Sequence, residues 1–484
     1  MTADRLDVPG LGVSADTEWE IVVGLEVHAE LATQTKLFSA SSNRFGGEPN
    51  THIDSVSLGL PGSLPVVNQK AVELAIRVGL ALNCTVGPSV FARKNYFYPD
   101  MPKGYQISQY DQPINTNGWL ELPCGKRIGI ERAHLEEDTG KTTHIGGSGR
   151  IHEAGYSLVD YNRAGVPLIE IVGRPELRSA QEARQYVAEL RAILVAVRAS
   201  DGKMEEGSLR VDCNVSVRPM GSEALGTRCE IKNVNSLRSM GRAIDYEARR
   251  QIELLMSGEL VAQQTRHWNE DDGCTHALRS KEEDYDYRYF PEPDLLPLDP
   301  DPEWVEEIRQ RLPALPRDRR LELAKAAPSV DVDHIALVVE RSMDTLTLVA
   351  IDEGGAPERV MTHVVHNLAE GSGELTAGAL AEMVQMEEAG ELTATQAKKV
   401  LSTLVDGGGS PRQVAQTLGF EAIQSSELAS IVDGLIAQYS DEWSRYCAGE
   451  AKLTGFFVGQ VMKATQGRAD GKVVTQLLHS RLEP

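Results

Sequence analysis

An alternating segment near the N-terminus is the feature that most constrains how this chain folds. Every odd-numbered residue from Ile21 to Leu31 is apolar, which predicts a β-strand with one face against a hydrophobic core. Glu26, His28 and Glu30 would then share the opposite face. Two carboxylates and an imidazole in one row can ligate a divalent cation or transfer protons. Taken alone, however, the pattern favours an amphipathic strand whose polar face meets water.

Two later segments repeat this alternation and add cations to it. The run from Ser208 to Arg218 places Arg210 and Asp212 on its polar face. The run from Arg228 to Asn233 also alternates and offers Glu230. If the two runs pair, one sheet face carries carboxylates that can hold a metal ion beside cations that can bind phosphate. A solvated sheet face predicts the same alternation, but with fewer arginines and asparagines among the acids.

Three consecutive acidic residues follow a histidine in the segment from His134 to Lys141. They are Glu136, Glu137 and Asp138. Adjacent carboxylates repel one another unless cations neutralise them. An acidic turn in solvent is a common alternative, and a Mg²⁺ site is the more specific hypothesis.

The chain lacks the common nucleotide-binding loops. Gly140-Lys141-Thr142 imitates the end of a Walker A loop, but Leu135 stands where that loop requires its first glycine. No G-x-G-x-x-G and no H-E-x-x-H segment occurs. Any nucleotide therefore binds outside a P-loop or a Rossmann crevice.

The overall composition restricts the partners and the compartment. The formal net charge of −22 argues against DNA and anionic membranes as partners, and any contact with RNA must be local. Six scattered cysteines without a C-x-x-C pair form neither a disulfide framework nor a zinc cluster. The N-terminus has no apolar signal core and no apolar run has the length of a bilayer span. We therefore expect a cytoplasmic protein.

A proline-rich stretch from Arg288 to Pro302 separates a strand-rich part from a helical part, because such a density of prolines cannot continue a helix or a central strand. Beyond it, the apolar residues between Ala397 and Leu404 follow a helical period that stops at three consecutive glycines, residues 407–409. Ser410-Pro411 then resembles a helix start.

The C-terminal end carries an excess of cations, including Lys463, Arg468 and Lys472. These cations need no partner if they are simply exposed on short helices.

The segments described above, taken together, resemble the GatB/GatE family, whose bacterial members are B subunits of the glutamyl/aspartyl-tRNA amidotransferases. The resemblance is carried by residues 20–31, 35–38, 98–109, 134–141, 160–172, 210–218, 230–233, 279–282 and 286–295. The last stretch, residues 459–482, is similar to the tRNA-contacting tail that the family shares with the YqeY proteins.

The resemblance implies an α+β fold with several domains. These are a disordered N-terminal extension at residues 1–18 and a catalytic cradle domain with a mixed or antiparallel sheet and flanking helices at residues 19–295. An all-α helical domain at residues 296–406 and a small α-helical tRNA-binding tail at residues 410–484 would follow.

The resemblance also implies the reaction. The γ-phosphoryl group of ATP passes to the side-chain carboxylate of Glu-tRNA(Gln) or Asp-tRNA(Asn), and ammonia then displaces phosphate to give the amide. The ammonia comes from glutamine hydrolysis in the amidase subunit GatA through an internal tunnel, within a heterotrimer that also contains the small subunit GatC. Mg²⁺ is the implied cofactor and ATP a substrate, because phosphoryl transfer needs metal ligands and cations.

On this resemblance we predict the following roles for residues of this chain. The catalytic residues are Glu26, His28, Lys103, Glu136 and Glu137, and the Mg²⁺ ligands are Glu26, His28, Glu137, Asp212 and Glu230. Lys103 would be a tunnel or pocket lysine that faces the acids at 136–137. Phosphate would be contacted by Arg163 and Arg210, and tRNA by Lys463, Arg468 and Lys472.

The chain departs from the family at one loop. Many relatives bind zinc there through four cysteines, but the corresponding residues here are Ser39, Ser41, Asp54 and Ser57. Hydroxyl groups and one carboxylate cannot replace thiolates as zinc ligands, so we predict no structural zinc. Other contacts must hold this loop, and residues 43–53 are expected to be more mobile.

Three hypotheses differ in class. The first is a catalytic subunit with the kinase and transamidation site. The second is a non-catalytic tRNA-binding adaptor subunit whose acidic faces are only solvated. The third, an independent metallohydrolase, is weak because the sequence offers no nucleophile or hydrolase motif.

Overall fold

The computed structural model describes residues 18–146, 154–278, 287–420, 425–450, 452–465, 469 and 471–482. The N-terminal extension predicted at residues 1–18 therefore lies outside the described residues, except for Glu18. The chain divides into two compact units, Met1–Arg317 and Asp318–Pro484. The first unit holds a mixed sheet and the second is helical, which confirms the predicted α+β class. The domain boundaries given above stay predictions.

A sheet of 12 strands forms the frame of the first unit, and all its strand pairs are antiparallel except β11 with β12. Its strands are β1 (Trp19–Glu30), β2 (Thr85–Val86), β3 (Phe91–Asn95), β4 (Tyr105–Gln109), β5 (Asn115–Glu121), β6 (Arg127–Glu137), β9 (Pro167–Gly173), β10 (Leu209–Pro219), β11 (Cys229–Lys232), β12 (Gln264–Asn269), β13 (Cys274–Ala277) and β14 (Phe290–Pro291). Strands β7 (Lys141–Ile145) and β8 (Tyr156–Asp160) form a separate pair.

Strand β1 lies at the centre of this sheet, between β10 and β9. Its alternation has the predicted effect, since Val23, Leu25, Val27 and Ala29 are at most 1% exposed. The two later alternating runs form β10 and β11, and they pair with each other, which meets the condition stated for a shared polar face. The polar residues of these strands consequently share one face of one sheet.

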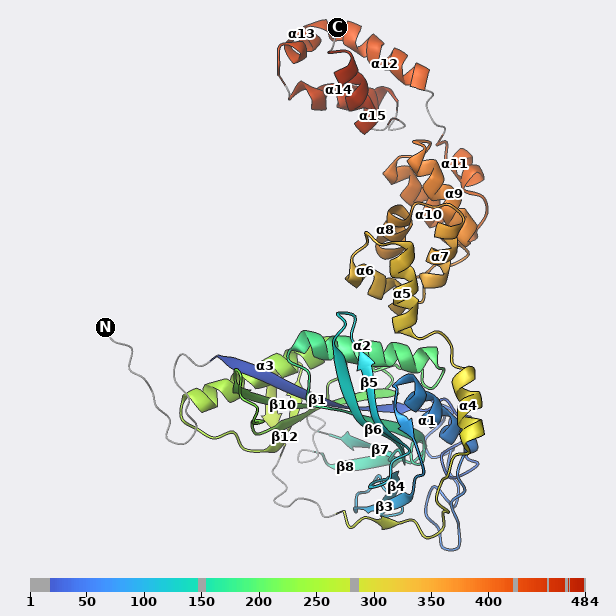
Figure 1. Cartoon of the computed structure of the whole chain (residues 1–484), viewed down its shortest axis with the longest axis vertical. Helices are drawn as coiled ribbons and strands as arrows, with labels where there is room; N and C mark the ends of the chain where they lie inside the picture. The colour runs from blue at the N-terminus through green and yellow to red at the C-terminus, as the bar shows by residue number, and fades with distance from the viewer. Residues whose placement is uncertain are drawn as a thin grey trace, which may run out of the picture. The chain divides into compact units, whose positions relative to one another are not determined.

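Three helices lie against the apolar side of the strands: α1 (Gln69–Ala81), α2 (Ala180–Ala196) and α3 (Leu237–Met256) (Figure 1). Side chains cap each of their N-termini, because Asn68, Ser179 and Ser236 accept hydrogen bonds from first-turn amides. The buried faces of the helices join the odd-numbered residues of β1 in one hydrophobic core. The helix α4 (Pro302–Gln310) packs on α1 and contributes Ile308 to the same core. The opposite face of the sheet carries the polar residues Glu26, His28 and Glu30 of β1.

The second unit contains two hydrophobic clusters. The first is built from α5 (Pro316–Ala326), α6 (Val332–Glu340), α7 (Asp344–Asp352), α8 (Pro357–Asn367), α9 (Ala377–Glu388), α10 (Ala394–Gly407) and α11 (Pro411–Thr417). The second is built from α12 (Ser425–Gln438), α13 (Ser440–Cys447), α14 (Leu453–Ala464) and α15 (Gly471–Ser480).

The predicted helix end at the three glycines is confirmed. Helix α10 stops at Gly407, and Gly408 has a φ of 64°, which an L side chain rarely adopts. Pro411 then occupies the first turn of α11 after Ser410, as the sequence predicts, although the Ser410 side chain makes no capping hydrogen bond. Among the described residues, no helix is long and apolar enough to cross a bilayer.

Candidate active site

The polar face of the sheet carries a row of charged side chains at its centre. The register places Arg210 of β10 opposite His28 of β1, His28 opposite Glu170 of β9, and Glu170 opposite His134 of β6. Directly paired residues of antiparallel strands point to the same face. Glu136 follows His134 by two residues and joins the same face. Three adjacent strands, β1, β9 and β6, thus bring two histidines and two glutamates together, and β10 adds Arg210 beside them.

These four side chains contact one another closely. The Nε2 atom of His28 lies 3.5 Å from Oε1 of Glu136 and 3.5 Å from Oε2 of Glu170. The Nε2 atom of His134 lies 3.4 Å from Oε2 of Glu170 and 4.0 Å from Oε2 of Glu136. His134 and Glu136 are buried, and the Nδ1 atom of His134 has no hydrogen-bond partner. A cluster of this kind is electrostatically strained unless cations compensate the carboxylates.

The two histidines have opposite protonation tendencies. Burial alone would lower the pKa of His28, but the hydrogen bond to Glu170 and the charge of Glu136 raise it to about 9. Burial lowers the pKa of His134 to about 4. At neutral pH, His28 therefore supplies the positive charge that lies between the two carboxylates, and His134 stays neutral.

The pKa values of the two carboxylates, Glu136 and Glu170, are shifted in opposite directions. Burial and the charge of Glu170 raise the pKa of Glu136 to about 6. Burial acts in the same direction on Glu170, but His134, His28 and Lys94 outweigh it and hold the pKa of Glu170 below its ordinary range. Pairs of titratable groups with pKa values pushed apart are typical of functional sites.

The donor set fits a divalent cation. One ligand atom from each of His28, Glu136 and Glu170 lies within 4.8 Å of the other two, which is the spacing that one ion can bridge. Carboxylate oxygens are the ligands that Mg²⁺ and Mn²⁺ prefer, and one imidazole nitrogen completes such a set. A metal ion here would compete with the proton that His28 otherwise carries.

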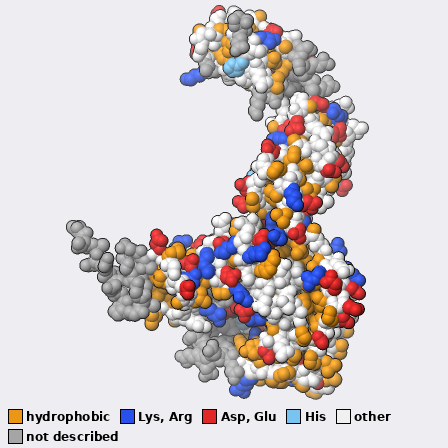
Figure 2. Space-filling view, in the orientation of Figure 1, with side chains coloured by type: hydrophobic (Ala, Val, Ile, Leu, Met, Phe, Trp, Pro, Cys, Tyr) orange, Lys and Arg blue, Asp and Glu red, His pale blue; other side chains and the backbone are white. Residues whose placement is uncertain are grey.

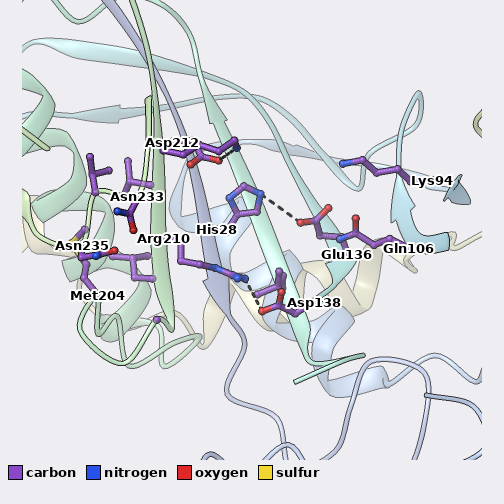
Figure 3. Close-up of a pocket in the computed structure, with 16 residues that line it drawn as sticks. His28, Lys94, Gln106, Glu136, Asp138, Met204, Arg210, Asp212, Asn233 and Asn235 are labelled. Atoms are coloured by element: carbon purple, nitrogen blue, oxygen red, sulfur yellow. Dashed lines mark hydrogen bonds and ion pairs between the residues drawn. The ribbon is translucent and has the colours of Figure 1, made fainter. Parts of the chain in front are cut away.

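A cavity of about 510 Å³ opens beside this cluster, in the size range of sites for small molecules. Figure 3 shows His28 and Glu136 facing each other at its centre, with Lys94 and Gln106 beyond Glu136 and Arg210 near Asp138. The remaining lining residues are Leu168, Met204, Gly207, Leu209, Val211, Asp212, Lys232, Asn233, Val234 and Asn235. Cations and carboxylates thus surround one space.

The two arginines predicted to contact phosphate share one carboxylate. Arg210 donates a hydrogen bond of 2.7 Å to Oδ2 of Asp138, and the Nε atom of Arg163 lies 3.4 Å from the same oxygen. Asp138 is only 4% exposed, whereas both arginine side chains are one-third exposed. Of the two arginines, only Arg210 lines the cavity, and phosphate contacts by either of them stay a prediction.

The predicted ligands of β10 and β11 surround a lysine. The ammonium of Lys232 lies 2.6 Å from Asp212 and 2.8 Å from Glu230. Glu26 instead accepts a hydrogen bond of 2.9 Å from Asn214, and burial followed by the charge of Glu170 raises its pKa. These three carboxylates therefore form a second group beside the cluster of His28.

Glu137 and Lys103 lie apart from both groups. Glu137 follows Glu136 directly, so its side chain leaves the opposite face of β6. Its carboxylate pairs with Lys103 and accepts a hydrogen bond of 2.9 Å from the amide of Ile107. Neither residue lines the cavity. Lys103 does face the acidic segment, as the resemblance implies, and a role in a tunnel stays a prediction.

The sequence reasoning missed two members of the cluster. Glu170 has no predicted role, because the segment 160–172 contributes only to the family resemblance, yet it is the one charge in the run from Leu168 to Val172. A lone carboxylate in a central strand is itself a signal of a paired or ligating group. The sequence identifies His134 only as a neighbour of the acidic residues 136–138. Its partner Glu170 lies on another strand, and the register alone brings them together.

The loop that departs from the family is held by hydrogen bonds. The amide of Ser57 donates to Asp54 at 2.7 Å, the hydroxyls of Ser39 and Ser57 are 3.5 Å apart, and the amide of Ser41 donates to Ser39 at 3.3 Å. The four residues that replace the cysteines thus stay together. Hydrogen bonds also join residues 48–52 to residues 159–162, and the mobility of residues 43–53 stays a prediction.

Of the three cations predicted to bind tRNA, Lys463 is exposed in the last turn of α14. Arg468 and the side chain of Lys472 lie outside the described residues.

Comparisons with known proteins agree over nearly the whole chain. A model described as the GatB/GatE catalytic domain matches residues 21–306, and one described as the GatB domain matches residues 358–482. The B subunit of the aspartyl/glutamyl-tRNA(Asn/Gln) amidotransferase of Moorella thermoacetica is 47% identical over 482 residues, covering 96% of this chain and 100% of the relative. The protein of the same name from Thermosynechococcus vestitus is 46% identical over 490 residues, covering 97% and 98%.

Proposed function

The chain belongs to the GatB/GatE family, and on that premise we propose that it works as the B subunit of a tRNA-dependent amidotransferase, a ligase that amidates misacylated tRNA with the use of ATP. The observation that carries its catalytic role is the cluster of His28, Glu136 and Glu170 beside a cavity of about 510 Å³. Solvated acids on an adaptor surface would not need to be buried and mutually paired. The cytoplasm, where charged tRNA is abundant, is the proposed compartment.

The reaction we propose has two steps. An oxygen of the side-chain carboxylate of Glu-tRNA(Gln) or Asp-tRNA(Asn) forms a bond to the γ-phosphorus of ATP, and the bond to ADP breaks. Ammonia then forms a bond to the acyl carbon of this mixed anhydride, and phosphate leaves. Glutamine hydrolysis in GatA would supply the ammonia, and GatC would complete the heterotrimer.

The cavity provides positive charge for the phosphates. Lys94, Arg210 and Lys232 line it from three different strands. Burial opposes the charge on Lys94, but Glu136 and other neighbours raise its pKa, so the side chain stays protonated. Phosphoryl transfer depends mainly on positioning and charge neutralisation. Asp138 would orient Arg210 towards the anion.

We propose that His28, Glu136 and Glu170 hold Mg²⁺, and that Glu26, Asp212 and Glu230 form the adjoining side of the site. The ion would neutralise charge on the phosphoryl oxygens. Glu137, predicted from the resemblance as a ligand, is paired with Lys103 on the other side of β6. Its contribution to Mg²⁺ binding would therefore need its side chain to move.

A substitution of Glu170 by glutamine tests this assignment against the adaptor hypothesis. In the assembled complex, the Glu170→Gln variant should need roughly 10- to 100-fold more Mg²⁺ for half-maximal amidation, because an amide oxygen can still ligate but no longer carries a charge. The rate is measured as Gln-tRNA(Gln) formed from Glu-tRNA(Gln), ATP and glutamine at increasing Mg²⁺.

Glu131→Gln is the matched control, since Glu131 is an exposed residue of the same sheet outside the cavity. It should leave the Mg²⁺ requirement unchanged. An unchanged requirement in Glu170→Gln as well would contradict the proposed metal site.

The C-terminal cations give a separate prediction for tRNA binding. Replacing Lys463, Arg468 and Lys472 together by glutamine should weaken tRNA binding. The slope of the logarithm of the binding constant against the logarithm of the salt concentration should become shallower by about one unit for each phosphate that the protein no longer neutralises. Kd is measured by titration at several salt concentrations. The exposed pair Lys398 and Lys399 on α10, changed in the same way, is the control. If the salt dependence of tRNA binding had the same slope in both variants, the C-terminal cations would be exposed side chains that do not contact tRNA.

A further inference from the structure

Five tyrosines form a continuous row of rings on the first unit, in the order Tyr98, Tyr96, Tyr287, Tyr289 and Tyr110. Successive ring centroids are separated by 6.2 Å, 6.1 Å, 6.2 Å and 4.1 Å. Five of the 13 tyrosines of this aromatic-poor chain are therefore gathered in one place. The residues come from two segments that are distant in the sequence, so the fold assembles the row.

The row adjoins the cavity. Lys94 lines the cavity, and its ammonium lies 4.9 Å from the ring centroid of Tyr287, in the middle of the row. The amide of Asn95, the next residue of β3, donates to the carbonyl of Tyr287 at 2.9 Å. Tyr287 is therefore anchored to the same short segment of β3 that carries the cavity-lining Lys94.

Both ends of the row are open to solvent. Tyr98 is 43% exposed and Tyr110 is 58% exposed. The ring of Tyr110 is stacked on Tyr289 with an interplanar angle of 10°, which covers one of its faces and leaves the other accessible. On the face in view in Figure 2, hydrophobic side chains gather over the part of the first unit that contains β3 and β4. Tyr96, Tyr287 and Tyr289 between them are half-buried, so the two end rings are the ones open to a partner.

We propose that this tyrosine row binds the unpaired 3′ end of the aminoacylated tRNA by stacking its bases on the rings. This inference rests on the proposed function, because the amino acid is esterified to the terminal ribose. If its side chain enters the cavity, the terminal bases must lie at the mouth of the cavity. Single-stranded RNA is bound chiefly through stacking on aromatic side chains together with nearby cations.

The adenine of ATP is the other base that could stack here. A single base covers one ring, whereas the row presents an exposed ring at each of its two ends. The charge of the chain also favours the RNA end. With a net charge of −22, the protein gains little from general attraction to phosphate, and stacking does not depend on a positive surface.

The test compares Tyr110→Ala with two matched variants in the complete amidotransferase complex. Tyr110→Phe keeps the ring, and Tyr156→Ala removes a tyrosine of similar exposure, 61%, on β8 outside the row. The measured quantities are Kd for Glu-tRNA(Gln), Kd for the same tRNA trimmed of its unpaired 3′ nucleotides, and KM for ATP.

We expect Tyr110→Ala to weaken binding of the intact tRNA roughly 5- to 100-fold, the range for loss of one stacked base. The trimmed tRNA should bind Tyr110→Ala and the unchanged protein equally, and Tyr110→Phe and Tyr156→Ala should behave as the unchanged protein. A raised KM for ATP with unchanged tRNA binding would overturn the proposal and assign the row to ATP. Equal binding of intact tRNA by Tyr110→Ala and Tyr156→Ala would also overturn it. Neither the Kd for tRNA nor the KM for ATP requires the proposed Mg²⁺ ligands to be correct. A failure of the tyrosine-row proposal can therefore be told from a failure of the proposed metal site.

Discussion

Replacing His28 with alanine should lower the rate of ATP-dependent amidation on the order of 1000-fold, the effect of losing several kcal/mol of stabilisation of the transition state. His28 lies 3.5 Å from both Glu136 and Glu170. Its removal takes away a proposed ligand and the imidazole that carries positive charge between the two carboxylates, whereas His134, which also contacts both, stays neutral. Mg²⁺ would then be bound with the wrong geometry, and the buried carboxylates would repel each other.

The measurement separates catalysis from tRNA binding. Amide formation is followed with saturating ATP, glutamine and Glu-tRNA(Gln), and Kd for the tRNA is determined on the same preparation. Kd should change less than about twofold, because a change of one side chain inside the cavity leaves the tRNA-contacting surfaces unaltered.

His144→Ala is the matched control, since His144 belongs to β7, hydrogen-bonds Ser157 and lies outside the cavity. It should retain full activity. Near-normal amidation by His28→Ala would contradict the catalytic role and would favour the adaptor hypothesis.

The sequence predicts much of the sheet because alternation is a local property. The apolar residues at odd positions of β1 predict its buried face, and the same pattern predicts β10 and β11. The order of strands is not local. That β9 lies between β1 and β6 follows from the tertiary fold, and no spacing within one segment reveals it.

The site was predictable in part for the same reason. His28 and Glu136 were proposed from the sequence, and the structure brings them to 3.5 Å. Glu170 could be included only once the register placed it opposite both His28 and His134. Glu137 shows the converse, because adjacent residues of a strand point to opposite faces even when they belong to one acidic run. Sequence proximity therefore groups residues that the sheet separates.

Replacing Glu247 with alanine should lower the free energy of unfolding of the first unit by about 3–5 kcal/mol, the usual cost of removing one member of a buried ionic network. Glu247 of α3 is fully buried. Its carboxylate accepts hydrogen bonds from Arg250 at 2.6 Å and from Thr275 at 2.8 Å, and it lies 3.2 Å from Nε of Arg266. The contacts join α3 to β12 and β13. Without Glu247, Arg266 would remain buried without a carboxylate partner.

The contribution of Glu247 to the free energy of unfolding changes with pH in a defined direction. Burial acts to raise the pKa of Glu247, but the hydrogen bonds from Arg250 and Gln251 outweigh it and hold the pKa below the ordinary value of 4.5. The ionised carboxylate is thus favoured in the folded state. Its stabilisation is fully present above pH 4.5 and is lost as the pH falls through the lower pKa of the folded state. The difference between Glu247→Ala and the unchanged protein should therefore shrink in acid.

Urea unfolding and hydrogen exchange of the β11–β13 amides measure this effect, since exchange reports on the first unit separately from the helical unit. Glu253→Ala is the matched control, because Glu253 is an exposed glutamate of the same helix and its loss should cost less than about 0.5 kcal/mol. Glu247→Gln should fall between the two, since it keeps a hydrogen-bond acceptor but not the charge. If Glu247→Ala and Glu253→Ala unfolded at the same urea concentration, the two arginines would have to be stabilised by solvent, and the network would not hold α3 on the sheet.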